Sequence, residues 1–190
     1  MIDSAAELFR ARGYNGVGLT EILAESGAPK GSFYHHFPRG KEELALAVIE
    51  NGGRFVSKFI NASFESAYTV EDAVLRFTNG IAYAFKESGF TLGCPITSIL
   101  LDLAPGDARI RDAGKQVLET WITKMAENAA RLGVSESDRQ AYEKAFRVLL
   151  IAIEGGWIVA RATNTIAPIM LAQDTFANTL SAELAKLRAK

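Results

Sequence analysis

The residues best suited to chemistry lie together near the N-terminus, in the stretch APKGSFYHHFPRGKEEL at positions 28–44. This stretch contains both histidines of the chain, His35 and His36, beside a tyrosine and several cationic side chains. Metal binding, catalysis and nucleic-acid contact all use such residues. Adjacent histidines on a helix point about 100° apart and therefore do not share one metal ion. A Ser-His-Asp hydrolase would need a strand before its serine, and the sequence shows no strand-like alternation. We therefore predict no metal, no cofactor and no enzyme activity.

The residues before this stretch show apolar positions at helical spacing. Apolar residues from Ile2 to Phe9 fall at i, i+3, i+4 and i+7, which predicts a first helix that Gly13 ends. A second short helix is predicted from about Leu19 to Gly27. Three short helices with a tight glycine turn between the second and third form a helix-turn-helix, whose second member can lie in the major groove of DNA.

The third helix has a predicted inner and outer side. Pro29 suits its first turn, and Phe33 and Phe37, four residues apart, predict its inner face. Lys30 in the first turn, and Lys41 at the start of the next helix, suit contacts to phosphate. The residues expected to point outward are Gly31, Ser32, Tyr34 and His35.

The rest of the chain predicts an all-α fold of about nine helices. A fourth helix, at about 41–62, is expected to link the three-helix head to a larger helical body. Gly52-Gly53 is expected to interrupt this helix and to mark close packing or a bend, because two glycines cost about 2 kcal/mol of helix propensity. We divide the chain into a helix-turn-helix domain at 1–50 and a helical body at 51–190.

Composition narrows the function classes. The 190 residues carry a formal net charge of −1, so DNA binding would depend on where charges lie, not on their sum. The N-terminus does not resemble a signal peptide and no apolar stretch is long enough to span a membrane, which predicts a cytoplasmic protein. A single cysteine, Cys94, excludes an internal disulfide.

AAELFRARGYNGVGLTEILAESGAPKGSFYHHFPRGKEEL resembles the DNA-binding domain of the TetR family of bacterial transcriptional regulators. GCPITSILLDLA and EGGWIVARA resemble the subgroup that contains LmrA- and YxaF-type repressors. The resemblance implies a homodimeric repressor, released from a palindromic double-stranded DNA operator by a small ligand. It also implies that the body binds the ligand and forms the dimer, with the last two long helices pairing in a four-helix bundle.

The resemblance further implies which residues contact DNA. The residues at the family's contacting positions are Lys30, Gly31, Ser32, Tyr34, His35, His36 and Lys41. Members often place threonine at the N-cap of the second helix. Here Gly18 holds that position, and we expect Thr20 to replace the contact in part. Members usually also carry a basic arm before the first helix, whereas this sequence starts at Met1-Ile2. Either the arm is absent or it lies outside this sequence. Its absence would mean fewer phosphate contacts, weaker binding and a shallower salt dependence.

Two further groups are candidates within the body. A cavity for an apolar or aromatic ligand is one interpretation of several aromatic and sulfur side chains, and ordinary core is the other. These are Phe85, Phe90, Cys94, Trp121, Met125 and Phe146. A strip of small residues on the eighth helix predicts a dimer interface, with packing inside the chain as the alternative. Its members are Ala152, Gly155, Gly156 and Ala160.

Two alternatives to a ligand-released repressor stay open. The first is a helical ligand- or protein-binding module, in which the head mediates protein contacts; the negative net charge favours it. The second is a regulator switched by oxidation of Cys94, whose place at a predicted helix start would lower its pKa. The plainer interpretation of Cys94 is a small buried apolar residue.

Overall fold

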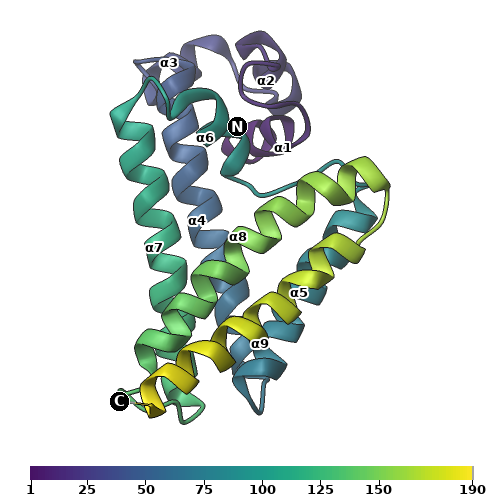
Figure 1. The fold of residues 1–190 in the computed structure, drawn as a ribbon. Helices are drawn as coiled ribbons and strands as arrows, with labels where there is room; N and C mark the ends of the chain where they lie inside the picture. The colour runs from purple at the N-terminus through teal and green to yellow at the C-terminus, as the bar shows by residue number, and fades with distance from the viewer. Residues whose placement is uncertain (190) are drawn as a thin grey trace. The chain divides into compact units, whose positions relative to one another are not determined.

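The computed structural model describes residues 1–189, and over this range it is all-α, as predicted (Figure 1). The nine helices of the described chain are α1 (Ile2–Arg12), α2 (Leu19–Ser26), α3 (Lys30–His36), α4 (Lys41–Glu65), α5 (Val70–Glu87), α6 (Thr97–Leu103), α7 (Ala108–Arg131), α8 (Arg139–Thr163) and α9 (Ala167–Arg188).

Most helix ends follow from local sequence. Gly13 and Gly27 end α1 and α2 with φ of +77° and +63°, values that cost glycine little because it has no Cβ. Thr69 begins α5 by accepting a hydrogen bond on its Oγ1 from the Asp72 N–H at 3.1 Å. Asn164 ends α8 in the left-handed region, where asparagine is the most tolerant residue after glycine.

The chain divides into two compact units. The first contains Met1–Phe55 together with Thr91–Leu118, and the second contains Val56–Phe90 together with Glu119–Lys190. The first unit therefore includes α6 and the start of α7 besides the head. This differs from a simple division into 1–50 and 51–190, because a segment late in the sequence folds with the N-terminal helices.

The glycine pair of α4 explains part of this packing. The prediction that Gly52-Gly53 interrupts the helix was wrong, since α4 is continuous through both. A Cβ on Gly52 would lie 3.0 Å from Cβ of Pro95, and one on Gly53 would lie 2.8 Å from the side chain of Val117. Close packing against the later segment thus outweighs the low helix propensity of glycine.

In the second unit, α8 and α9 run side by side as a pair joined by a short loop, and α5 packs against α9 (Figure 1). The rings of Phe146 and Phe176 stack between α8 and α9 with their centroids 5.3 Å apart. Ala160 is fully buried with Phe85 and Ile169 in one apolar cluster. The two long helices are thus fixed to each other mainly by apolar contact.

The absence of a side chain at Gly156 lets α8 and α9 pack closely. A Cβ there would lie 3.0 Å from Pro168 O and 3.0 Å from Ile169 Cα, both backbone atoms of α9. Gly156→Ala should lower Tm by several degrees, because separating the helices costs about 1–3 kcal/mol and exceeds the gain in helix propensity. Thermal unfolding followed by circular dichroism measures this.

The matched control is Gly31→Ala in α3, where no atom lies within 4 Å of the added Cβ. Its Tm should equal or exceed that of the wild type. Equal melting of Gly156→Ala and wild type would show that α8 and α9 are not packed as closely as described.

Candidate nucleic-acid interface

Helix α3 is short and is held by one buried ring. The backbone turns sharply at Gly27, where the Ala28 N–H donates to Leu23 O at 3.2 Å. Pro29 caps the new helix, and its carbonyl accepts the Phe33 N–H at 3.1 Å. The Phe33 side chain is fully buried, with its ring centroid 5.5 Å from that of Phe37. This anchor determines which side of α3 faces outward.

The opposite side of α3 is exposed. Tyr34 is 45% exposed and its ring meets Phe33 edge-on, at a centroid distance of 5.0 Å. The rings of His35 and His36 also meet edge-on, 5.2 Å apart, and do not converge on one point. Ser32 is half-buried. The exposed residues of α3 are Lys30, Gly31, Tyr34, His35 and His36.

Two other cations of the head form ion pairs. Arg12 pairs with Glu21, and Arg39 with Glu43 at 3.5 Å. The Lys30 side chain, by contrast, makes no hydrogen bond or ion pair with any residue in the described range 1–189. Its exposed ammonium is therefore available to an external anion.

Lys41 lies deeper than the sequence suggested. Its Nζ donates to Tyr14 O at 2.6 Å and lies 3.8 Å from the centroid of the Tyr14 ring. Burial lowers the pKa of Lys41, and the negative charge of Asp102 opposes that shift. An ammonium has three N–H donors, so the bond to Tyr14 leaves others for a phosphate. No local sequence signal predicts the contact with Tyr14, because 27 positions separate the two residues.

The start of α2 lacks a side-chain cap. Gly18 is the N-cap residue and has no side chain to offer, while Thr20 is exposed in the first turn. The Thr20 hydroxyl thus faces solvent, beside backbone N–H groups that are typical phosphate ligands. Together with α3, these groups present hydroxyl, imidazole and ammonium donors on the three-helix head. Such donors suit both phosphates and base edges.

The candidate ligand residues lie in different parts of the chain. Cys94 belongs to the first unit and the other five to the second. Phe90 is half-buried, with its ring edge-on to Phe85 at 5.4 Å, and the remainder are buried. Cys94 is 6% exposed, which agrees with its interpretation as a small apolar residue.

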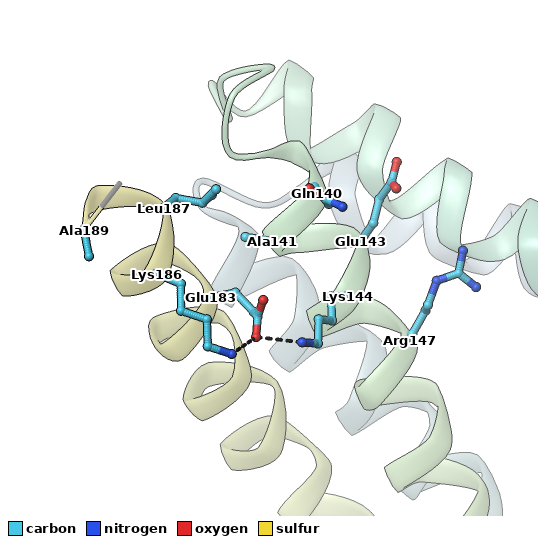
Figure 2. Close-up of a pocket in the computed structure, with 9 residues that line it drawn as sticks. All are labelled: Gln140, Ala141, Glu143, Lys144, Arg147, Glu183, Lys186, Leu187 and Ala189. Carbon is cyan, nitrogen blue, oxygen red and sulfur yellow. Dashed lines mark hydrogen bonds and ion pairs between the residues drawn. The ribbon is translucent and has the colours of Figure 1, made fainter.

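A hollow of about 790 Å³ does occur in the second unit, but none of those six residues lines it (Figure 2). It lies between the start of α8 and the end of α9. Two lysines share one carboxylate there, since Lys144 and Lys186 each approach Glu183 Oε1 to 2.7 Å. The residues around it are Gln140, Ala141, Glu143, Lys144, Arg147, Glu183, Lys186, Leu187 and Ala189.

The strip of small residues on α8 divides between two sides of the helix. Gly156 and Ala160 are buried within the chain, whereas Gly155 is exposed with open space around it, and Ala152 is half-buried. This differs from the expectation that all four lie on one intermolecular face. Sequence reasoning missed the exposed apolar residues beside Gly155. These are Ile151, Ile158 and Val159 on α8 and Leu171 on α9.

Two buried donors of the second unit lack a partner. They are Nε1 of Trp157 on α8 and Nε2 of Gln173 on α9. A buried donor without an acceptor costs about 1–3 kcal/mol, so each suits an acceptor from outside the chain. No sequence signal distinguishes these two polar groups from hydrogen-bonded ones.

None of the helices in residues 1–189 is long and apolar enough to cross a membrane. Within the same range, no group of three or more His, Cys, Asp or Glu side chains is arranged to hold a metal ion.

The geometry of the head and its similarity to known proteins both indicate a helix-turn-helix DNA-binding regulator. The head has three helices around a buried core and exposes its third helix, which is the arrangement typical of such regulators. Residues 1–48 match the family described as bacterial regulatory proteins of the tetR family, and residues 71–175 match the LmrA/YxaF-like C-terminal domain of transcriptional regulators. The chain belongs to the TetR family of transcriptional regulators, which are DNA-binding proteins and not enzymes.

Individual proteins show the same similarity over nearly the whole chain. The HTH-type regulators YxaF and LmrA of Bacillus subtilis are 29% and 28% identical to it, over 90% of this chain and 88% and 89% of theirs. The crystal structure of a regulatory protein TetR from Rhodobacter sphaeroides has a TM-score of 0.78 and 28% identity, and covers 94% of this chain and 95% of its own. A TetR regulator from Legionella pneumophila shares the fold, with a TM-score of 0.76 at 18% identity and 94% coverage of both chains.

Proposed function

We propose that the protein is a homodimeric, sequence-specific repressor that a small molecule releases from a palindromic operator. The observation that carries the DNA-binding part is the outer face of α3, which is exposed, polar and supplied with an unpaired ammonium at Lys30. Two copies related by a two-fold axis would place two such helices in successive major grooves, about 34–36 Å apart. The protein would act in the cytoplasm, where bacterial DNA lies.

The exposed apolar side of α8 supports dimer formation. Ile151, Gly155 and Ile158 follow each other at i, i+4 and i+7, which places them on one side of the helix. Ile151 is 70% exposed and Ile158 is 69% exposed, and Leu171 of the neighbouring α9 is exposed as well. A contiguous apolar patch on a protein surface is typical of an interface. The lack of a side chain at Gly155 would let a second copy of α8 approach closely.

The unpaired donors of the second unit support control by a ligand. The Trp157 indole belongs to a partly buried group with Phe90 and Met170, next to the buried Phe85. An apolar or aromatic molecule with an oxygen acceptor would suit such surroundings. A coupling of about 1–3 kcal/mol between ligand and operator would be enough to release the repressor. A thermal-shift screen of such compounds, followed by operator release, tests this part.

Gel-shift experiments on the DNA upstream of the protein's own gene test the proposed DNA binding. The variant Lys30→Ala tests the proposed phosphate contact of Lys30 through the salt dependence of binding. Each phosphate contact contributes about 0.9 to the slope of log K against log salt, so a dimer that loses two contacts should lose about 1.8. The affinity should fall similarly for specific and non-specific DNA. Fluorescence anisotropy at several salt concentrations measures both quantities.

Lys58→Ala is the matched control, because Lys58 is equally a lysine, is exposed and lies on α4 outside the head. It should leave the slope unchanged. A salt slope for Lys30→Ala equal to that of the wild type would remove Lys30 from the phosphate contacts.

A further inference from the structure

The turn between α1 and α2 is held by a residue distant in the sequence. The Asn15 N–H donates to Oδ2 of Asp102, on α6, at 2.8 Å. The same oxygen lies so close to the turn that a Cβ on Gly13 would be 3.3 Å from it. The positive φ of Gly13 turns the chain at this point. The carboxylate of Asp102 thus lies directly against the backbone of the turn.

Lys41 holds the preceding residue of the same turn. Its ammonium donates to Tyr14 O and covers the Tyr14 ring. Tyr14 in turn packs against Phe9 of α1, with ring centroids 5.3 Å apart. The negative charge of Asp102 also acts on Lys41. Groups from α1, α4 and α6 therefore meet at the two residues Tyr14 and Asn15.

A second polar contact joins the same segment to α1. Arg10 donates from Nε to Gly93 O at 2.8 Å and from Nη2 to Leu92 O at 3.4 Å. These carbonyls precede α6, whereas Asp102 lies near its C-terminal end. The segment around α6 therefore holds α1 near its C-terminal end and also holds the turn that follows. All these groups belong to the first compact unit.

The turn determines how the recognition helix is presented. Asn15 lies only four residues before the first residue of α2, and α2 leads through the tight turn at Gly27 into α3. Ile22 of α2 and Phe33 of α3 are both fully buried in the head. Because packed cores move as units, a change at the turn would tilt α2 and α3 together.

We propose that Asp102 is a positioning residue for DNA recognition: its hydrogen bond to Asn15 fixes the turn between α1 and α2, and so fixes the orientation of α3. The inference rests on the proposed DNA-binding function.

The variants Asp102→Ala and Asp102→Asn, compared together, distinguish a positioning role of Asp102 from a phosphate contact and from a general effect on stability. Asp102→Ala removes the acceptor and should weaken operator binding about tenfold, equivalent to about 1.4 kcal/mol. The salt slope should stay at the wild-type value, because no phosphate contact is lost. Asp102→Asn keeps an oxygen acceptor of the same length and should bind within about threefold of the wild type, a difference of about 0.7 kcal/mol. Asp112→Ala, which removes an exposed carboxylate on α7, should bind as the wild type does.

Hydrogen exchange at residues 13–17 provides a second readout that does not depend on DNA. Exchange should be faster in Asp102→Ala than in Asp102→Asn and the wild type. Asp102→Ser, whose side chain is too short to reach Asn15, should repeat the alanine result if the alanine variant folds poorly.

Operator affinity in Asp102→Ala equal to the wild type would overturn the positioning role, and so would an equal loss in Asp102→Asn. A wild-type protein that binds no DNA at low salt would overturn the proposed function, and the positioning role with it. Normal wild-type binding with unaffected variants would overturn the positioning role alone.

Discussion

Replacing Ile158 with lysine should convert the proposed dimer into a monomer and reduce operator affinity by about a hundredfold or more, because the advantage of binding two half-sites together is lost. Ile158 is 69% exposed on the apolar side of α8, so the single chain tolerates a lysine there. In a symmetric dimer the change places two ammonium groups in one apolar interface. A buried, unpaired charge costs several kcal/mol. Analytical ultracentrifugation gives the oligomeric state, and anisotropy gives the operator affinity.

Leu75→Lys is the control for this experiment. Leu75 is also an exposed aliphatic residue, but it lies on α5 and not on the proposed dimer face. It should leave both the dimer and the operator affinity unchanged. A dimer of normal strength in Ile158→Lys would contradict the assignment of this side of α8 to the interface.

Truncating Tyr34 should weaken specific operator binding by about 5- to 150-fold, the range that corresponds to about 1–3 kcal/mol for a lost base contact. The affinity for non-specific DNA should fall much less, because that affinity comes mainly from phosphates. Tm should change little, since Tyr34 is half-exposed and its main neighbour, Phe33, stays buried without it. Fluorescence anisotropy with operator and with unrelated DNA measures the ratio of specific to non-specific affinity.

Tyr68→Ala provides the comparison, because Tyr68 is 90% exposed in the loop before α5 and lies outside the head. It should bind operator as the wild type does. If Tyr34→Ala kept the full ratio of specific to non-specific affinity, the outer face of α3 would not read sequence.

The head was largely predictable because its signals are local. Gly13, Gly27 and Pro29 impose turns through their own backbone preferences. The spacing of Phe33 and Phe37 then indicates which side of α3 is buried, and the structure shows Phe33 buried and Tyr34 exposed. Few long-range contacts are needed for this result, which is why periodicity alone was sufficient.

The contacts between distant segments were not predictable in the same way. Nothing near Asp102 indicates that it receives the Asn15 N–H, and nothing near Lys41 indicates that its ammonium covers Tyr14. The glycines of α4 left close packing and a bend as alternatives, and the positions of Pro95 and Val117 decide between them. Residues 91–118 join the head through such contacts, which leave no periodic signal in the sequence.

The dimer face illustrates a related ambiguity. Small residues at 152, 155, 156 and 160 suit close helix packing on any side, so the sequence could not say which of them meet a helix of the same chain. The structure separates them, since a Cβ on Gly156 would lie 3.0 Å from Ile169 Cα, whereas a Cβ on Gly155 would have open space around it. No sequence signal distinguishes the exposed Ile151 and Ile158 from core residues, because apolar residues occur on more than one side of α8.

Hydroxyl-radical footprinting on the DNA upstream of the protein's own gene tests the central claim most directly. If two copies of α3 enter successive major grooves, wild-type protein at low salt should protect two patches related by a two-fold axis, with centres about 10–10.5 base pairs or a multiple of that apart. Tyr34→Ala should lose both patches together. A uniform pattern without protected patches, or protection of one unpaired half-site by a monomer, would contradict the account.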